Sequence, residues 1–142
     1  MVASKIDFSA QFGGVDAAAS VLPHFKMLKK AAGGLRLQGF PYPKLAFILR
    51  VDGEINKFGF SGSGYPAIDK RGKYLSIDIG LQQSDRDRID EAITEAILSS
   101  VDVVRSKLRD SNDVDFQELE QCLVSLCVRY KEEIARSHEA NG

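Results

Sequence analysis

The sequence predicts a single two-layer α+β domain over residues 1–142, in which helices cover one face of a four-stranded, mainly antiparallel sheet. Three observations predict this class. Short segments of alternating apolar and polar residues have the period of half-buried strands. The second half of the chain carries two long apolar stripes at helical spacing. The 142 residues, of which 44% are hydrophobic and 27% charged, suffice for one buried core.

The first strand and the first helix are expected at residues 5–12 and 17–30. Apolar and polar residues alternate in the first range, and Gly13 and Gly14 follow it. The second range has apolar residues at helical spacing, and Pro23 should kink or split that helix.

Three further strands are expected between residues 45 and 81. The apolar run at 45–51 leads through Asp52 and Gly53 into 54–61, and Asp-Gly between two apolar runs predicts a tight antiparallel hairpin. A glycine-rich loop is expected at 62–72. Strict alternation then predicts the fourth strand at 74–81.

Two antiparallel helices should complete the order β-α-β-β-β-α-α. The first has an apolar stripe from Ile89 to Leu108 and a capping-box-like start at Ser84. The second opens at Asp115, and its last residues, 137–142, should fray. The stripes and strands predict one shared core: Phe47, Leu49, Leu75, Ile77, Ile79, Ile93, Ile97, Val101, Phe116, Leu119, Leu123 and Leu126.

Composition excludes several classes of protein. The net charge of −1 lacks the broad basic footprint of a dedicated nucleic-acid binder. No apolar run is long enough for a membrane span, and the N-terminus does not have the pattern of a signal peptide. Cys122 and Cys127 are five residues apart in a helical pattern, which suits reduced thiols in the cytoplasm.

No catalytic residue, metal site or cofactor is expected. Ser61 lies in a sequence that lacks the last glycine of the Gly-x-Ser-x-Gly motif. The two histidines, His24 and His138, have no partner at metal-ligand spacing, and neither do the cysteines. Residues Gly62 and Gly64 begin an apparent dinucleotide fingerprint, but no helix is expected after them to hold a pyrophosphate.

Charge is distributed unevenly along the chain, which indicates one candidate docking surface. Residues 1–81 have eleven Lys and Arg against six Asp and Glu, whereas residues 82–120 have five against eleven. An acidic surface of this kind would steer a basic partner, although it could also serve only solubility. The candidate residues at the start of the long helix are Asp85, Asp87, Asp90, Glu91 and Glu95.

The expected loop at 62–72 and its neighbours are the second candidate surface. Aromatic and charged side chains together are typical of protein contacts, but they also occur in ordinary hairpin loops. The candidate residues are Tyr65, Asp69, Arg71 and Tyr74.

The segments at 45–55, 58–62 and 74–79 resemble small immunity proteins of bacterial polymorphic-toxin and contact-dependent growth inhibition systems. The resemblance implies a compact, cytoplasmic, non-enzymatic inhibitor that binds a cognate toxin domain and occludes its active site. These families share a role more than a motif, so the resemblance assigns no functional residue.

Two other hypotheses remain open. A small enzyme or ligand-binding domain would have a pocket between sheet and helices, with a constellation of reactive residues. A structural adaptor could form a homodimer through a sheet edge.

Overall fold

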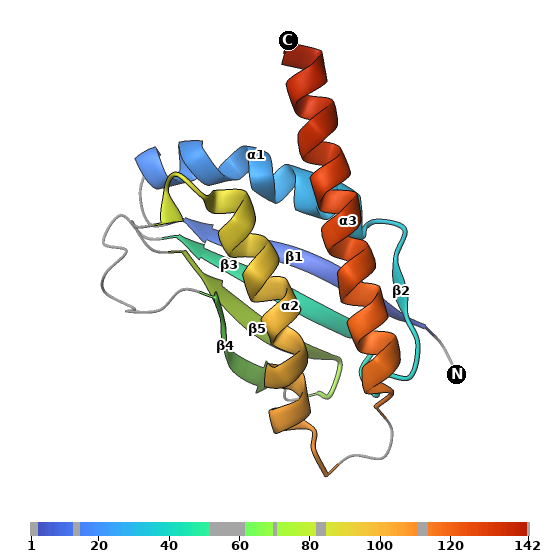
Figure 1. Cartoon of the computed structure of the whole chain (residues 1–142). Coiled ribbons are helices and arrows are strands. Elements are labelled where there is room, and N and C mark those ends of the chain that lie inside the picture. Colours follow the sequence, from blue (N-terminus) through green and yellow to red (C-terminus); the bar gives the residue numbers. More distant parts are fainter. Residues whose placement is uncertain are drawn as a thin grey trace.

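The computed structural model describes residues 3–12, 15–51, 62–69, 71–81, 85–110 and 114–141. Over these ranges three helices pack on one face of a mixed sheet (Figure 1). The elements, in chain order, are β1 (Ser4–Phe12), α1 (Val15–Ala32), β2 (Arg36–Leu37), β3 (Lys44–Val51), β4 (Gly62–Ile68), β5 (Tyr74–Gly80), α2 (Ile89–Lys107) and α3 (Phe116–Asn141).

The sheet has four long strands and the two-residue β2, in the order β2-β1-β3-β5-β4. The three inner strands β1, β3 and β5 run parallel, and only the outer strands β2 and β4 pair in antiparallel fashion. The predicted α+β class is confirmed, but the prediction of a mainly antiparallel sheet is wrong. The reason is the 18-residue α1 between β1 and β3, which is long enough for the crossover that parallel strands require.

β3 does not form the antiparallel hairpin that was expected, because parallel strands pair with both of its edges. From Lys44 to Arg50, β3 pairs with β1 at one edge and with β5 at the other. The second strand expected for that hairpin, residues 54–61, lies outside the described residues. The range predicted as a glycine-rich loop contains a strand, since β4 pairs with β5 and changes register between Gly64 and Ala67.

The first two helices start at other residues than expected, whereas the third starts as expected. α1 continues as one helix across Pro23 and is not split. Arg88 is the N-cap of α2 and makes no side-chain capping bond, while Ser84 of the expected capping box is outside the described ranges. At α3, the Asp115 carboxylate accepts the main-chain N–H of Glu118 at 3.1 Å, as a helix cap should.

One core lies between the sheet and the helices. α1 covers β1, α2 covers β4 and β5, and α3 packs against α1, α2 and β2, with its C-terminal end projecting beyond the other elements (Figure 1). Eleven of the twelve predicted core residues are buried, and Phe116 is half-buried against that core. α3 continues through Asn141, and Gly142 lies outside the described residues.

Candidate functional site: an acidic helical surface and a basic groove

The five carboxylates predicted as a docking surface lie at and just before the start of α2, and they differ in exposure. Asp87 is exposed and Asp90 is half-buried, whereas Asp85 is buried with 3% of its surface accessible. The side chains of Glu91 and Glu95 are 69% and 67% exposed. The outward part of this acidic segment therefore consists of Asp87, Glu91 and Glu95.

Arg88 lies among these carboxylates and pairs with three of them. It donates to Glu95 at 2.6 Å, to Asp85 at 3.3 Å and to Glu91 at 3.5 Å. The hydrogen bond to Glu95, followed by the charge of the same carboxylate, raises the pKa of Arg88. The negative charge of the segment is thus partly neutralised in place, and a charge count along the sequence overstates it.

A recess of about 240 Å³ lies between α2 and α3 beside the exposed glutamates. The two helices are antiparallel neighbours, because Cys127 Sγ is 4.0 Å from the Thr94 carbonyl oxygen and Arg105 lies 5.4 Å from the Phe116 ring centre. The recess is lined by four residues of α2 and one cation of α3: Asp90, Glu91, Thr94, Glu95 and Lys131.

Exposed apolar side chains continue from this recess along the outer side of the helix pair. Leu98 follows Thr94 by one turn and is 41% exposed; Val124 and Val128 precede Lys131 on α3 and are 45% and 51% exposed. Residues three and four apart share one side of a helix, so these side chains form a strip beside the recess. We refer to this set as the α2–α3 surface: Asp90, Glu91, Glu95, Leu98, Val124, Val128 and Lys131.

Three of the four residues of the second predicted surface lie at the hairpin turn between β4 and β5, where the Asp69 N–H donates to the Tyr74 carbonyl at 3.0 Å. Tyr65 belongs to β4, and its side chain is outside the described part of the structure. Asp69 and Arg71 form the turn between β4 and β5, where the Arg71 N–H donates to the Asp69 carboxylate at 3.3 Å. Tyr74 lies on the sheet face away from the helices, with the Lys44 ammonium 5.1 Å from its ring centre.

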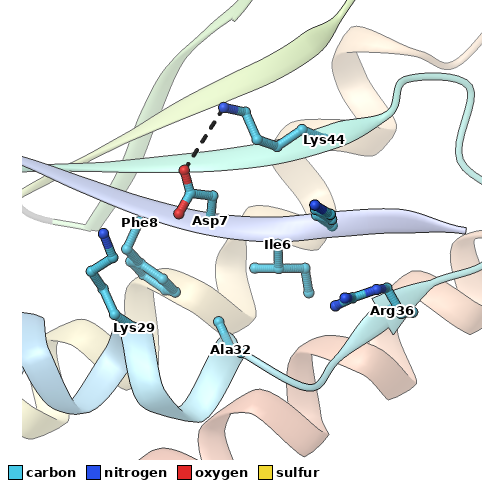
Figure 2. Close-up of a pocket in the computed structure, with 9 residues that line it drawn as sticks. Ile6, Asp7, Phe8, Lys29, Ala32, Arg36 and Lys44 are labelled. Atoms are coloured by element: carbon cyan, nitrogen blue, oxygen red, sulfur yellow. Dashed lines mark ion pairs between the residues drawn. The ribbon is translucent and has the colours of Figure 1, made fainter.

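A larger recess, of about 440 Å³, follows the edge of β1 and was not predicted from the sequence (Figure 2). Its charged lining residues come from β1, α1, β2 and β3, and we call the recess the basic groove. Four of them are cations and one is an anion: Lys5, Lys29, Arg36, Lys44 and Asp7.

The cations of the basic groove have few carboxylate partners. Lys44 Nζ lies 3.7 Å from an Asp7 carboxylate oxygen, as the dashed line in Figure 2 marks. Within the described residues, Lys5, Lys29 and Arg36 form no ion pair. The groove therefore holds uncompensated positive charge, and the only sign of it in the sequence is the basic excess of residues 1–81.

Burial shifts the pKa of four side chains on α1 and α3. His24 Nδ1 is 2.7 Å from the Tyr130 hydroxyl oxygen. Burial lowers the pKa of His24 and raises that of Tyr130. Burial also raises the pKa of the free thiol of Cys127 to about 11, and it raises that of Cys122. Both thiols are therefore held in the protonated form, in which they are poor nucleophiles and metal ligands.

In the described ranges, no three His, Cys, Asp or Glu side chains are grouped so that they could hold a metal ion. No helix of these ranges is both long and apolar enough to cross a membrane. Comparison with protein families, curated proteins and solved structures gives no match to the chain.

Proposed function

We propose that the protein is a non-enzymatic binding module of the immunity-protein type, which binds and neutralises a basic bacterial toxin domain in the cytoplasm. The partner docks on the α2–α3 surface. The observation that supports this proposal is the position of exposed apolar side chains. Of the five large hydrophobic side chains that are exposed among the described residues, three lie on this surface: Leu98, Val124 and Val128.

The composition of the α2–α3 surface suits a protein partner. Interfaces typically have an apolar centre, which is desolvated on binding, and a polar rim that stays wet. The Leu98–Val128 strip corresponds to such a centre, and Glu91 and Glu95 correspond to the rim. Rim charges contribute mainly to the rate of association with a partner of opposite charge, which is why we expect a basic one.

The rival hypothesis is a ligand-binding domain or enzyme with a pocket between sheet and helices. In the described core, that space is filled by side chains such as Phe47, Ile77 and Ile97, each with 0% exposure. The two recesses described above lie on the outer side of the helix pair and at a sheet edge. A surface partner accounts for these features better than an internal ligand does.

The proposal predicts that a toxin domain is encoded next to the gene of this protein. It is tested by coexpression of the chain with that domain in a bacterial host that the toxin kills. We expect the chain to restore growth and to bind the purified toxin domain. Glu91→Lys with Glu95→Lys should slow association by about tenfold or more at low salt, and the defect should shrink as salt rises. Leu98→Ser with Val128→Ser should instead accelerate dissociation.

The matched control reverses Asp110 and Glu139, which are exposed beyond the far end of α2 and near the C-terminal end of α3. It changes the net charge by the same amount and should leave both rate constants within about twofold. Equal defects in both charge-reversed proteins would remove the proposed docking surface. A toxin that is neither bound nor neutralised would contradict the immunity function. If the chain forms a dimer in solution and Val128→Ser dissociates it, the α2–α3 surface is a contact between two copies of the chain.

A further inference from the structure

The edge of β1 is unpaired where it enters the basic groove. β2 pairs with β1 only at Ser4 and Lys5. The Lys5 N–H donates to the Pro43 carbonyl at 3.0 Å, so the main-chain groups of Lys5 face β3. Successive residues of a strand face opposite sides, which turns the N–H and C=O groups of Ile6 and Phe8 toward the free edge.

These two residues line the basic groove. The antiparallel register of Lys5 with Arg36 directs the Ile6 N–H at the Leu35 carbonyl, whereas the Ile6 carbonyl and both main-chain groups of Phe8 form no hydrogen bond within the described part of the chain. The groove thus presents a short row of main-chain donors and acceptors. Lys29 stands on the α1 side of this row and Arg36 on the β2 side (Figure 2).

We propose that the basic groove binds an extended acidic segment of a protein, which adds to the sheet as a strand along β1 beyond Lys5. Main-chain hydrogen bonds to Ile6 and Phe8 hold the segment, and its carboxylates pair with Lys5, Lys29 and Arg36. Strand addition of this kind obtains affinity from the main chain and selectivity from side chains on either side. The site is separate from the α2–α3 surface, whose expected partner has the opposite charge.

The positive charge of the basic groove favours an acidic segment over a second copy of the chain as its occupant. Pairing β1 with β1 of another copy would bring the uncompensated cations of two grooves together, and like charges in proximity oppose association. An acidic strand removes that repulsion instead. A small organic ligand fits less well, because such ligands favour enclosed and mainly apolar pockets.

The probe is a blocked heptapeptide in which Glu alternates with Val, titrated against the isotope-labelled full chain. We expect saturable binding that weakens with salt, and at least about tenfold slower amide exchange at Phe8. The Asp7 amide, which faces β3, serves as the internal reference. The same peptide N-methylated at every residue keeps its charge but loses the main-chain donors of both edges, so it should bind at least about tenfold more weakly.

Two double variants test the side chains. Lys29→Glu with Arg36→Glu should weaken peptide binding by about tenfold or more. Lys107→Glu with Arg109→Glu, an equal charge change at exposed residues outside the groove, should leave it within about twofold. Lys29→Gln alone gives a milder change if the first double variant unfolds, and it should still weaken binding measurably.

Several results would overturn the proposal. Equal binding of the N-methylated peptide, or displacement of the peptide by inorganic phosphate at concentrations where chloride has no effect, would make the groove a site for small anions. If both double variants lose the same amount of peptide affinity, binding depends only on the net charge of the protein and not on the groove. All of these measurements are made without the toxin, so they are independent of the function proposed for the α2–α3 surface.

Discussion

The α2–α3 surface and the basic groove are opposite in charge, and their charged residues are also arranged differently along the chain. The acidic residues are adjacent in one helix, and Arg88 and Lys131 lie among them. The cations of the groove come from four elements, and only Lys44 has a carboxylate partner in the described ranges. A contiguous charged stretch can therefore be nearly compensated, while dispersed residues can converge into an uncompensated site.

Both surfaces depend on α3. This helix forms one wall of the recess beside Glu91, and it also supports β2, since Cys122 Sγ lies 3.9 Å from the Arg36 carbonyl oxygen. Damage to the core under α3 should therefore affect both surfaces, whereas changes in surface residues should affect one surface only.

The largest effect is expected from Leu123→Ala, because Leu123 has 0% exposure at the centre of the packed face of α3. The truncation should lower the free energy of unfolding by about 2 to 5 kcal/mol, through lost transfer free energy and the cavity left behind. Denaturant melts measure the change. The neighbouring Val124→Ala, at a site that is 45% exposed, should cost less than about 0.5 kcal/mol. Similar costs at both sites would mean that α3 does not pack as described.

The success and failure of the fold prediction have distinct physical causes. Alternation identified β1 and β5, and the stripes of α2 and α3 identified the helices, because burial on one face imposes a period that the sequence carries locally. Strand direction carries no such local period. Asp52-Gly53 suggested a hairpin, but the parallel pairing of β3 with β1 and β5 is set by tertiary packing of the crossover.

The candidate sites show the same contrast. The acidic residues were found because five of them fall within eleven consecutive positions at and just before the start of α2, but only the structure reveals their partial neutralisation by Arg88. Leu98, Val124 and Val128 look like ordinary helix residues in the sequence, since their exposure depends on what packs nearby. The groove had no local signal, because Lys5, Lys29 and Arg36 meet only through the β1-α1-β2 path of the chain.

A smaller effect is expected on the pH dependence of stability. It arises from His24 on α1, whose ring nitrogen lies 2.7 Å from the hydroxyl oxygen of Tyr130 on α3. Burial lowers the pKa of His24 below its usual 6.5, and Asp90 opposes this only in part. Between the folded and unfolded pKa values, the unfolded chain therefore binds more protons, so the free energy of unfolding falls as pH drops below about 6.5.

Replacement of His24 by Gln tests this assignment, because an amide can pair with the Tyr130 hydroxyl but does not titrate. Melts between pH 7 and pH 5 should show a weaker pH dependence in this variant than in the wild-type protein. The control His138→Gln, at an exposed residue near the end of α3, should keep the wild-type dependence. An unchanged pH dependence in both proteins would mean that protonation of His24 does not destabilise the fold.

The smallest effect is expected from Arg88→Gln, which addresses the compensation of the acidic segment directly. The amide keeps a hydrogen-bond donor for Asp85 but removes the charge that pairs with Glu91 and Glu95. The association rate with a basic partner should rise roughly two- to threefold at low salt, because the exposed glutamates are no longer neutralised. The matched variant Arg86→Gln removes a charge from an exposed residue with no ion pair among the described residues, and it separates a local effect from net charge. If both variants raise the rate equally, Arg88 contributes only to the net charge, and the contrast between a compensated acidic surface and an uncompensated basic groove loses its functional meaning.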